Sequence, residues 1–502
     1  MYCPGLKEFL KLSKKANVVP VYKDVSADLD TPVSTFLKIK KNDYAFLLES
    51  VEGQEKIARY SLMGSNPNLI FRSKANNIEL IYADRKKRGS APVKNRERFI
   101  GRTDPLSELR KVMNYFKPAV VNGLPRFFGG FVGYVSYDMV RFFEKLPDKN
   151  RDDLKLPDAI FILTNNILVF DHMKHKIKII DNVIIPGNHK KYSKNALRRL
   201  YNQAVRDIEN VHKELKKPLS NSKEDTKKSL KAIKISSNFK KKKFMEIVRK
   251  AKDYIRKGDI IQVVLSQRLK AKIQRKPFDI YRKLRSLNPS PYMFYLKLKE
   301  VTLIGSSPEM LVRCEGGIVQ TRPIAGTRPR GKTEKEDQRL EAELCKDKKE
   351  AAEHIMLVDL GRNDLGRISK PGKVRVSEFM KVEKYSHVMH LVSEVTGVLN
   401  KKYDSFDVLR ACFPAGTVSG SPKIRAMEII EELENIKRNL YAGCVGYFSF
   451  SKNMDTCITI RTIVIQGNRA YIQAGAGIVA DSKPEKEYYE SMSKASALLE
   501  SL

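Results

Sequence analysis

The sequence of 502 residues contains no tryptophan and only six cysteines, at positions 3, 314, 345, 412, 444 and 457. Their spacing shows no CxxC pair and no disulfide framework, so we expect reduced thiols in a cytoplasmic protein. No apolar run is long enough to cross a bilayer. The first ten residues, Met1–Leu10, also lack the apolar core of a signal peptide. We therefore expect no membrane association.

Acidic residues are scarce, because 58 Asp and Glu stand against 95 Lys and Arg and give a formal net charge of +37. Such an excess is typical of nucleic-acid-binding proteins, and a basic protein of that kind remains the alternative from a different class. The lysines, however, are spread over the whole chain and are not interleaved with aromatic residues, as a base-stacking surface requires. The pattern favours a solvated basic surface that attracts small anions, with no specific nucleic-acid partner.

The length predicts two domains or one large composite, because a single core rarely serves 502 residues. Residues 1–185 have a mixed pattern of helices and strands, with strands expected at Asp43–Ser50, Ala159–Phe170 and Lys176–Ile180. These features predict an α+β fold for the first domain.

Residues 186–237 differ in composition from the rest of the chain. They begin as a basic helix, Asn195–Leu215, and continue into a Lys/Ser-rich stretch, Pro218–Ser229, which has the composition of a linker. A second domain, residues 238–502, is predicted to begin with a helix at Lys243–Arg256 and to end with one at Glu485–Leu499.

Two segments far apart in the chain resemble each other. Gly130–Tyr137 reads GFVGYVSY, and Gly443–Phe450 reads GCVGYFSF. This similarity suggests that the two domains contain related sheets, although chance similarity between glycine-punctuated strands is an equal alternative.

Two pairs of glutamates occur at helical spacing. Glu350 and Glu353 share a helix face with His354, and Glu487 and Glu490 repeat the i, i+3 spacing near the C-terminus. Two helices that each present two carboxylates can enclose one Mg²⁺, which prefers oxygen ligands and keeps waters for substrate oxygens. The alternative for either pair is an ordinary solvated helix face.

Glycine-rich segments lie close in sequence to both acidic helices. Thr321–Gly331 combines Gly, Pro and Arg, and Gln473–Ile478 contains Gly at alternate positions, where the backbone can approach a ligand closely. Arg461 follows an apolar strand, where a buried guanidinium needs a carboxylate partner. That carboxylate could belong to the protein or to a substrate.

Four motifs of the sequence together resemble the chorismate-binding enzymes, above all the large subunit of the anthranilate-forming members. The similarity covers residues 238–496 and, more loosely, the first domain. The motifs are Pro323–Gly331, Ala352–Asp364, Gly416–Lys423 and Gln473–Gly477. The resemblance implies large antiparallel sheets flanked by helices, an α/β sandwich-like form of the α+β class.

The resemblance also implies an activity. Ammonia would add to chorismate as a ring hydroxyl departs, and the aminodeoxyisochorismate intermediate would lose pyruvate to give anthranilate, the first committed step of tryptophan biosynthesis. A glutamine amidotransferase small subunit would supply the ammonia, in a heterotetramer of two large and two small chains. Cys412 and Cys444 lie in apolar contexts that do not suit glutamine hydrolysis.

Site residues follow by resemblance. Glu309 is expected to protonate the departing hydroxyl, and His390 to act near the ring during elimination. Mg²⁺ is expected on Glu353 and Glu490, supported by Glu350 and Glu487. Lys423 is expected near the pocket without an assigned role. The expected substrate-binding residues are Gly326, Thr327, Tyr441, Arg461, Gly475, Ala476, Gly477 and Lys494.

Two positions discriminate between reactions within the family. Isochorismate-forming members carry a lysine base where this chain has Gln262, which cannot deprotonate water, so ammonia is the better nucleophile. Aminodeoxychorismate-forming members carry a nucleophilic lysine where this chain has Ala325, and a methyl group cannot attack the ring. Aminodeoxychorismate synthesis, in the folate pathway, is therefore the second candidate.

Feedback inhibition by tryptophan is also implied. Leu48–Ser50 in the first domain and Asn288–Met293 in the second resemble the inhibitor site of the family. The expected inhibitor contacts are Ser50, Pro291, Tyr292 and Met293. A site between domains could couple ligand binding to their relative orientation.

Overall fold

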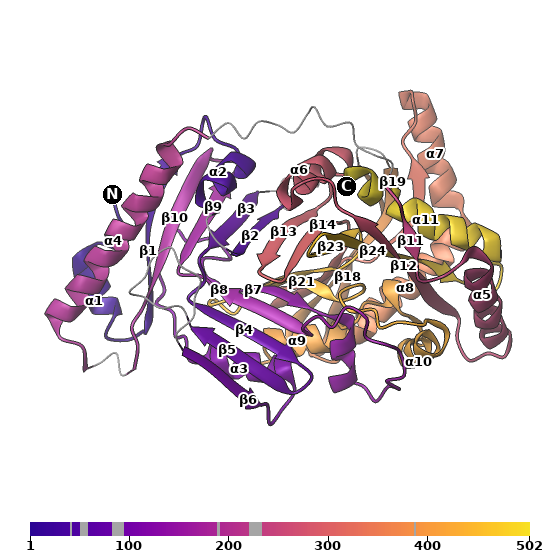
Figure 1. Ribbon diagram of the computed structural model, residues 1–502, viewed down its shortest axis with the longest axis horizontal. Coiled ribbons are helices and arrows are strands. Elements are labelled where there is room, and N and C mark those ends of the chain that lie inside the picture. Colours follow the sequence, from indigo (N-terminus) through magenta and orange to yellow (C-terminus); the bar gives the residue numbers. More distant parts are fainter. Residues whose placement is uncertain (41–42, 51–58, 83–94, 188–190, 220–232, 386–387) are drawn as a thin grey trace.

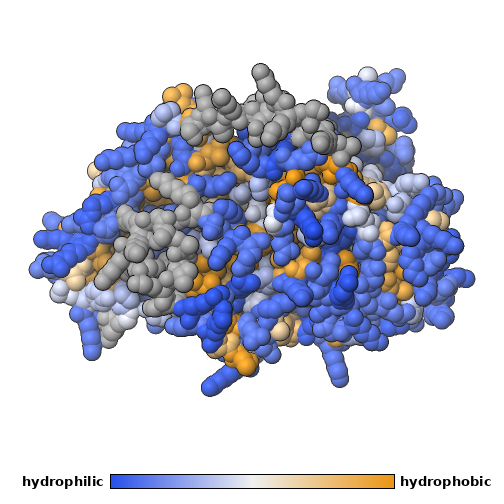
Figure 2. Space-filling model, viewed as in Figure 1, coloured by the Kyte–Doolittle hydropathy of each residue, from blue (hydrophilic) through white to orange (hydrophobic). Residues whose placement is uncertain are grey.

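The computed structural model describes residues 1–40, 43–50, 59–82, 95–187, 191–219, 233–385 and 388–502. Two large antiparallel sheets lie at its centre, with helices outside them (Figure 1). This architecture confirms the predicted α+β sandwich. Among the helices of the described residues, none combines the length and hydrophobicity needed to cross a bilayer. Figure 2 shows hydrophilic side chains over most of one face, with apolar residues in small scattered areas.

Each sheet contains twelve strands. The first sheet runs β1 (Val18–Ser26), β10 (Lys176–Ile184), β9 (Asn166–Asp171), β3 (Tyr60–Ser65), β2 (Tyr44–Glu49), β13 (Tyr292–Leu298), β14 (Val301–Ser307), β23 (Thr462–Gln466), β24 (Arg469–Ile478), β12 (Gln262–Lys272) and β11 (Ser236–Ser237), with β20 (Gly420–Ser421) on β12. The second runs β17 (Ile324–Pro329), β19 (Val388–Leu399), β16 (Ile318–Thr321), β15 (Met310–Glu315), β22 (Met454–Ile458), β21 (Cys444–Ser449), β7 (Gly130–Val135), β8 (Ala159–Leu163), β4 (Leu69–Lys74), β5 (Asn77–Tyr82) and β6 (Asn95–Ile100), with β18 (Ser369–Lys384) on β19.

The central strands are apolar on both faces because each face meets a different layer. In β2, Tyr44 and Phe46 belong to the core shared by the two sheets, whereas Ala45 and Leu47 belong to the core under the outer helices. This alternation follows from the two-residue repeat of a strand. The helices are α1 (Leu6–Leu12), α2 (Pro32–Ile39), α3 (Pro105–Asn114), η1 (Tyr137–Phe142), α4 (Lys194–Lys216), α5 (Lys241–Arg256), α6 (Pro277–Leu287), α7 (Glu334–Lys346), α8 (Lys348–Gly366), α9 (Ser405–Cys412), η3 (Gly416–Val418), α10 (Lys423–Leu433) and α11 (Pro484–Ser501).

Three predicted helices are present with nearly the expected bounds. The basic helix is α4, which lies against β1 and β10, and the helices expected at the two ends of the second domain are α5 and α11. Most of the Lys/Ser-rich stretch falls within residues 220–232, outside the described residues. The domain boundaries themselves stay a prediction.

Strands from the two halves of the sequence share both sheets. β2 pairs with β13 in the first sheet, with Glu49 opposite Met293, and β7 pairs with β21 in the second. We call these two strand pairs the seam. Backbone hydrogen bonding therefore continues from residues before the basic helix α4 to residues after it.

The two similar segments are neighbouring strands of this seam. β7 and β21 run in opposite directions with Gly133 opposite Gly446. They are not corresponding strands of two separate sheets, so that suggestion is wrong. The shared glycines have a local reason: a Cβ would lie 1.9 Å from the Ile160 carbonyl oxygen at Gly133 and 2.1 Å from the Asp455 carbonyl oxygen at Gly446.

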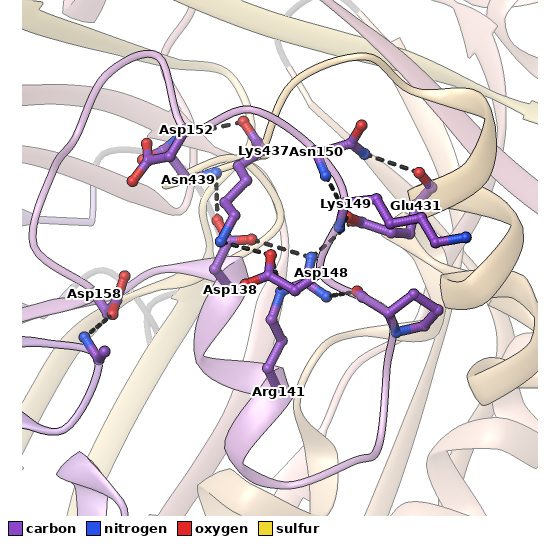
Figure 3. A network of polar contacts seen from close by, with 12 residues as sticks. Asp138, Arg141, Asp148, Lys149, Asn150, Asp152, Asp158, Glu431, Lys437 and Asn439 are labelled. Atoms are coloured by element: carbon purple, nitrogen blue, oxygen red, sulfur yellow. Dashed lines mark hydrogen bonds and ion pairs between the residues drawn. The ribbon is translucent and has the colours of Figure 1, made fainter.

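A buried polar network joins the loop after η1 to the end of α10 (Figure 3). One Glu431 carboxylate oxygen accepts hydrogen bonds from the backbone N–H groups of Lys149 and Asn150, at 2.7 and 2.8 Å. The other accepts from Arg141 at 2.7 Å. The segment that follows α10 leads to Tyr441, so this network fixes the approach to the predicted site.

Asp138 extends the same network. Its Oδ2 accepts a hydrogen bond from the backbone N–H of Asn439 at 2.9 Å, and burial raises its pKa to about 6. Lys437 pairs with Asp148 at 2.6 Å. Residues 138–150 and 431–439 are thus held together by side chains as well as by the sheets.

Replacing Glu431 with alanine should lower the free energy of unfolding by about 3 kcal/mol, because it leaves Arg141 and two backbone N–H groups without their buried acceptor. Urea unfolding followed by circular dichroism measures this change. The control is Glu432→Ala, since Glu432 is exposed beside it. Equal stability of the two variants would contradict the assigned role of the network.

Candidate active site

The predicted substrate residues gather around one end of β24. β12 pairs with β24 along its whole length, whereas β23 pairs with it only over Arg469–Ile472. From Gln473 to Ile478, β24 therefore has a strand neighbour on one side only, within the described residues. Its free edge carries Gly475 and Gly477, so backbone groups there can face a ligand.

Lys494, on α11, lies beside this edge. Its Nζ donates to the Gly475 carbonyl oxygen at 3.2 Å and pairs with Glu490 at 2.7 Å. A Cβ at Gly475 would lie 2.9 Å from the Tyr441 hydroxyl oxygen and 2.5 Å from the Leu265 carbonyl oxygen. Glycine is therefore required where the Tyr441 hydroxyl approaches the strand.

Arg461 approaches the same place from the turn before β23. Its Nη1 donates to the Lys494 carbonyl oxygen at 2.9 Å, and its φ of +49° is unusual for a residue with a Cβ. Burial lowers the pKa of Arg461, and no carboxylate lies within ion-pair distance of it in the described part of the chain. The structure thus presents a half-buried guanidinium with no acidic partner from the described residues.

Gln262 connects the strands to α8. Its Nε2 donates to Glu353 Oε1 at 3.2 Å, and a Cβ at Gly477 would lie 2.6 Å from the same nitrogen. The side chain of Ala476, in contrast, belongs to the core under β12. The side chain of Ala476 therefore does not reach the free edge of β24.

His390 lies on β19 opposite Thr327 of β17. Its Nδ1 is 2.9 Å from the Gly326 carbonyl oxygen and 3.1 Å from Thr327 Oγ1. A carbonyl oxygen only accepts, so Nδ1 carries the proton and Nε2 is left as the acceptor. Burial lowers the pKa of His390, and the charge of Arg461 lowers it further, so the ring is neutral near pH 7.

A bulge at Gly326 brings this strand to the acidic helix. The pairing register of β17 shifts between Ala325 and Thr327, where Gly326 has φ +67°. A Cβ at Gly326 would lie 3.3 Å from Glu350 Oε2. The bulge therefore places Thr327 and His390 beside the acidic side chains of α8.

The four predicted metal ligands form two pairs on two helices. Burial raises the pKa of Glu350 and the charge of Glu353 adds to the rise; Glu487 is raised in the same way by burial and by Glu490. The charge of Lys349, in the first turn of α8, opposes the rise in the pKa of Glu487, so the first turns of α8 and α11 are near each other. Among the described residues no three acidic, His or Cys side chains converge into a complete metal cage.

Glu309 occupies the link between β14 and β15. It is 8% exposed, and burial raises its pKa to about 8, against the opposing effects of the Thr417 hydroxyl and the Lys494 charge. A carboxyl group in this environment is protonated near pH 7. The backbone N–H of Ile458, at the end of β22, donates to the Glu309 carbonyl oxygen at 3.1 Å.

His354 and Lys423 make contacts with protein side chains near the site, and Thr417 and Asp364 were not predicted from the sequence. His354 is fully buried and lies 2.6 Å from Ser393 Oγ, so it belongs to the core although it follows Glu353. Lys423 pairs with Asp364 at 2.7 Å. Thr417 and Asp364 both fall within motifs that resemble the family, but sequence alone gave no reason to single them out.

The predicted inhibitor residues line one cavity of about 520 Å³ at the seam. Its wall includes Ser50, Pro291, Tyr292 and Met293, together with Asp455 of β22. The Tyr292 hydroxyl donates to Asp455 at 3.0 Å. Ser50 Oγ is buried and finds no hydrogen-bond partner among the described residues. The structure thus brings all four together around a space with an unused polar group.

Two arginines add to the polar side of this cavity. Arg313 donates to Asp455 at 3.0 Å and to the Tyr292 hydroxyl oxygen at 3.2 Å. Arg126 approaches Asp455 at 3.7 Å. The cavity therefore combines apolar walls with charged groups of both signs.

Comparison with known proteins agrees with this geometry. The family model described as chorismate binding enzyme matches residues 66–500. The chain belongs to this family of chorismate-binding enzymes.

Individual relatives are more specific. The chain is 49% identical to anthranilate synthase component 1 of Acetivibrio thermocellus, with 100% of this chain and 99% of the relative covered. It is 48% identical to the protein of the same name from Aquifex aeolicus, covering 99% and 97%. The crystal structure of anthranilate synthase component I from Streptococcus pneumoniae matches with a TM-score of 0.74 and 39% identity, over 89% of this chain and 95% of that one.

Proposed function

We propose that this chain is the chorismate-converting component of an anthranilate synthase, a lyase that forms anthranilate and pyruvate from chorismate and ammonia. One observation carries the proposal: Glu309 is a buried acid with a raised pKa that faces the charge of Lys494, and Arg461 binds the Lys494 backbone, in a chain 49% identical to an anthranilate synthase component 1 over its whole length. Amination of chorismate needs both features, since the substrate is a dicarboxylate that must lose a hydroxyl group.

The cations and the free strand edge provide the anion site. The guanidinium of Arg461 and the backbone N–H groups between Gly475 and Gly477 bind the substrate carboxylates in this proposal, with Lys494 beside them. Binding costs little desolvation of Arg461, because burial has already removed most of its water. The Tyr441 hydroxyl, held against Gly475, closes one side of the pocket.

The acid and the histidine perform the two proton transfers. Glu309 donates its proton to the departing hydroxyl, which leaves as water while ammonia adds to the ring. His390 then accepts a ring proton at Nε2 while the ring carbon–oxygen bond breaks with its electron pair on oxygen, because its Nδ1 proton is held by Gly326. The enolpyruvate that leaves takes up a proton at its methylene carbon and becomes pyruvate. Gln262 binds Glu353 and has no basic group, so it does not activate water as a competing nucleophile.

The donor set fits Mg²⁺. Glu353 and Glu490 would hold the ion and Glu350 and Glu487 would support it. Burial, and the charge of the neighbouring glutamate, raise the pKa of Glu350 and of Glu487, and a divalent cation would relieve this cost of holding paired carboxylates. An incomplete protein cage also suits Mg²⁺, which keeps positions for water and substrate. When bound, the ion would neutralise the ring carboxylate of the substrate.

Ammonia is expected from a second subunit, a glutamine amidotransferase component, in a heterotetramer of two large and two small chains. The naming of the relatives as component 1 supports this division of labour. The buried cysteines of this chain agree with it, since burial raises the pKa of both Cys412 and Cys444 and suppresses the thiolate.

The cavity at the seam is proposed to bind tryptophan as a feedback inhibitor. Its walls include β21 and β22, and these strands lead directly to the substrate residues: Tyr441 precedes β21 and Arg461 follows β22. The end of β22 also carries the N–H that binds the Glu309 backbone. A ligand that displaces either strand would disturb the substrate site. Inhibition then follows if the ligand binds the displaced arrangement more tightly than the arrangement that binds substrate.

Incubation of the purified chain with chorismate, Mg²⁺ and ammonium should release anthranilate, detected by its fluorescence, and an equal amount of pyruvate. The control is the same mixture without ammonium, which should give no anthranilate. An aminated product that retains its pyruvyl group would instead identify an aminodeoxychorismate synthase, and absence of any product would reject the proposal.

The pH profile should report Glu309. We expect kcat/KM to fall as pH rises through about 8, because only the protonated carboxyl can donate and its pKa is about 8. Glu309→Gln should lower kcat by about 100-fold or more. The control Glu315→Gln, at the exposed end of β15, should keep normal activity. A Glu309→Gln enzyme with normal kcat would disprove the acid role.

Ser50→Phe should relieve tryptophan inhibition while kcat stays unchanged, since a phenyl group would occupy the cavity but not the substrate site. A loss of about 1.4 kcal/mol in binding raises the inhibition constant about tenfold. Ser26→Phe, at the exposed end of β1, is the matched control and should remain inhibited. Steady-state assays with increasing tryptophan measure both. Unaltered inhibition of Ser50→Phe would remove this cavity from consideration.

A further inference from the structure

A second cavity, of about 400 Å³, shares Glu309 with the substrate site. Its walls come from α8, from the start of β15 and from the segment between α9 and α10. Its polar lining includes Glu309, Thr417 and Asp364. Neither Arg461, Lys494 nor His390 is among the described residues that line it, so this space is separate from the anion-binding side of the site.

Asp364 is an acid that the proposed reaction has not used. It lies on the last turn of α8, and Lys423, the first residue of α10, donates to its Oδ2 at 2.7 Å. Both side chains keep a small exposure, 13% for Asp364 and 15% for Lys423, so they adjoin solvent at one end. Arg367 and the Cys412 thiol also face Asp364. Burial raises the pKa of Asp364, although Lys423 opposes the rise.

Thr417 also lines the cavity. Its hydroxyl oxygen has no partner of normal hydrogen-bond geometry among the described residues, yet it is close enough to the Glu309 carboxyl to favour the ionised form. The charged group that faces Glu309 from the substrate side is Lys494. A hydroxyl group can accept and donate a proton at once, so Thr417 can pass a proton between a cavity water and Glu309.

The proposed reaction requires a route for water and for a proton next to Glu309. The carbon–oxygen bond breaks with its electron pair on oxygen, the Glu309 proton joins that oxygen, and one water and one carboxylate remain. The added ammonia carries an extra proton, which it loses to solvent. Each turnover must therefore remove one water from the site and return one proton to a carboxylate that is 8% exposed.

We propose that the cavity between Glu309 and Asp364 is the path by which the departing hydroxyl leaves as water and by which Glu309 regains its proton. Asp364, held by Lys423, accepts a proton from solvent and passes it through cavity water and the Thr417 hydroxyl to Glu309. The pair acts through Glu309 and does not touch the substrate. This inference rests on the proposed function, since it concerns the acid of that reaction.

Asp364→Asn tests the relay, because it keeps the shape and hydrogen-bonding capacity of the side chain but cannot carry a proton. We expect kcat with ammonium to fall about tenfold, with the KM for chorismate unchanged and a larger solvent deuterium isotope effect on kcat. Asp364→Glu should restore most of the rate. The matched control is Asp359→Asn, on the exposed face of the same helix, which should leave rate and isotope effect unchanged.

Thr417→Val provides a second test if Asp364→Asn lowers stability, since it removes only the hydroxyl from the same path. It should also lower kcat and raise the isotope effect. A normal isotope effect in both variants would overturn the relay, whatever their rates. A purely structural defect can lower kcat without raising the isotope effect, whereas a broken relay slows proton transfer and must raise it. Loss of anthranilate formation by the unmodified chain would instead reject the proposed function, so the two failures are distinguishable.

Discussion

Backbone hydrogen bonding across the seam is the constraint on which the rest of the structure depends. β2 and β13 join the halves in one sheet, and β7 and β21 join them in the other. In the second pairing Gly133 lies opposite Gly446, and carbonyl oxygens of the outer neighbours, Ile160 of β8 and Asp455 of β22, occupy the place of a side chain at each. The cavity proposed to bind the inhibitor is lined by residues of β2, β13 and β21, and β22 in its wall leads to Arg461, a predicted substrate residue.

The substrate site in turn depends on local departures from regular structure. Gly326 forms a bulge that brings β17 to Glu350, and Arg461 turns back with a positive φ before β23 begins. The edge of β24 stays open because β23 stops pairing with it at Ile472. Binding groups are thus placed where ladders of hydrogen bonds end, since backbone donors are free only there.

Much of this arrangement could be predicted from the sequence. Helical spacing indicated the acid pairs, apolar runs indicated the strands, and resemblance to a family assembled the motifs into one site. The pairing of β7 with β21 could not be predicted, because two similar strands can be equivalent parts of two sheets or neighbours in one. His354 shows the same limit: its spacing matches the acids, but Ser393, from a distant strand, determines its place in the core. A role for Asp364 and Thr417 could be proposed only from the structure, which shows that they share a cavity with Glu309.

The seam also affects how the chain can be made. During synthesis β2 and β7 leave the ribosome long before β13 and β21, their partners in the sheets, have been translated. Until then the first half carries two apolar strands with open edges, which are prone to pair with other chains. The same edges cannot be replaced by polar ones without breaking the seam. Neither sheet can therefore be completed until the second half of the chain has been translated.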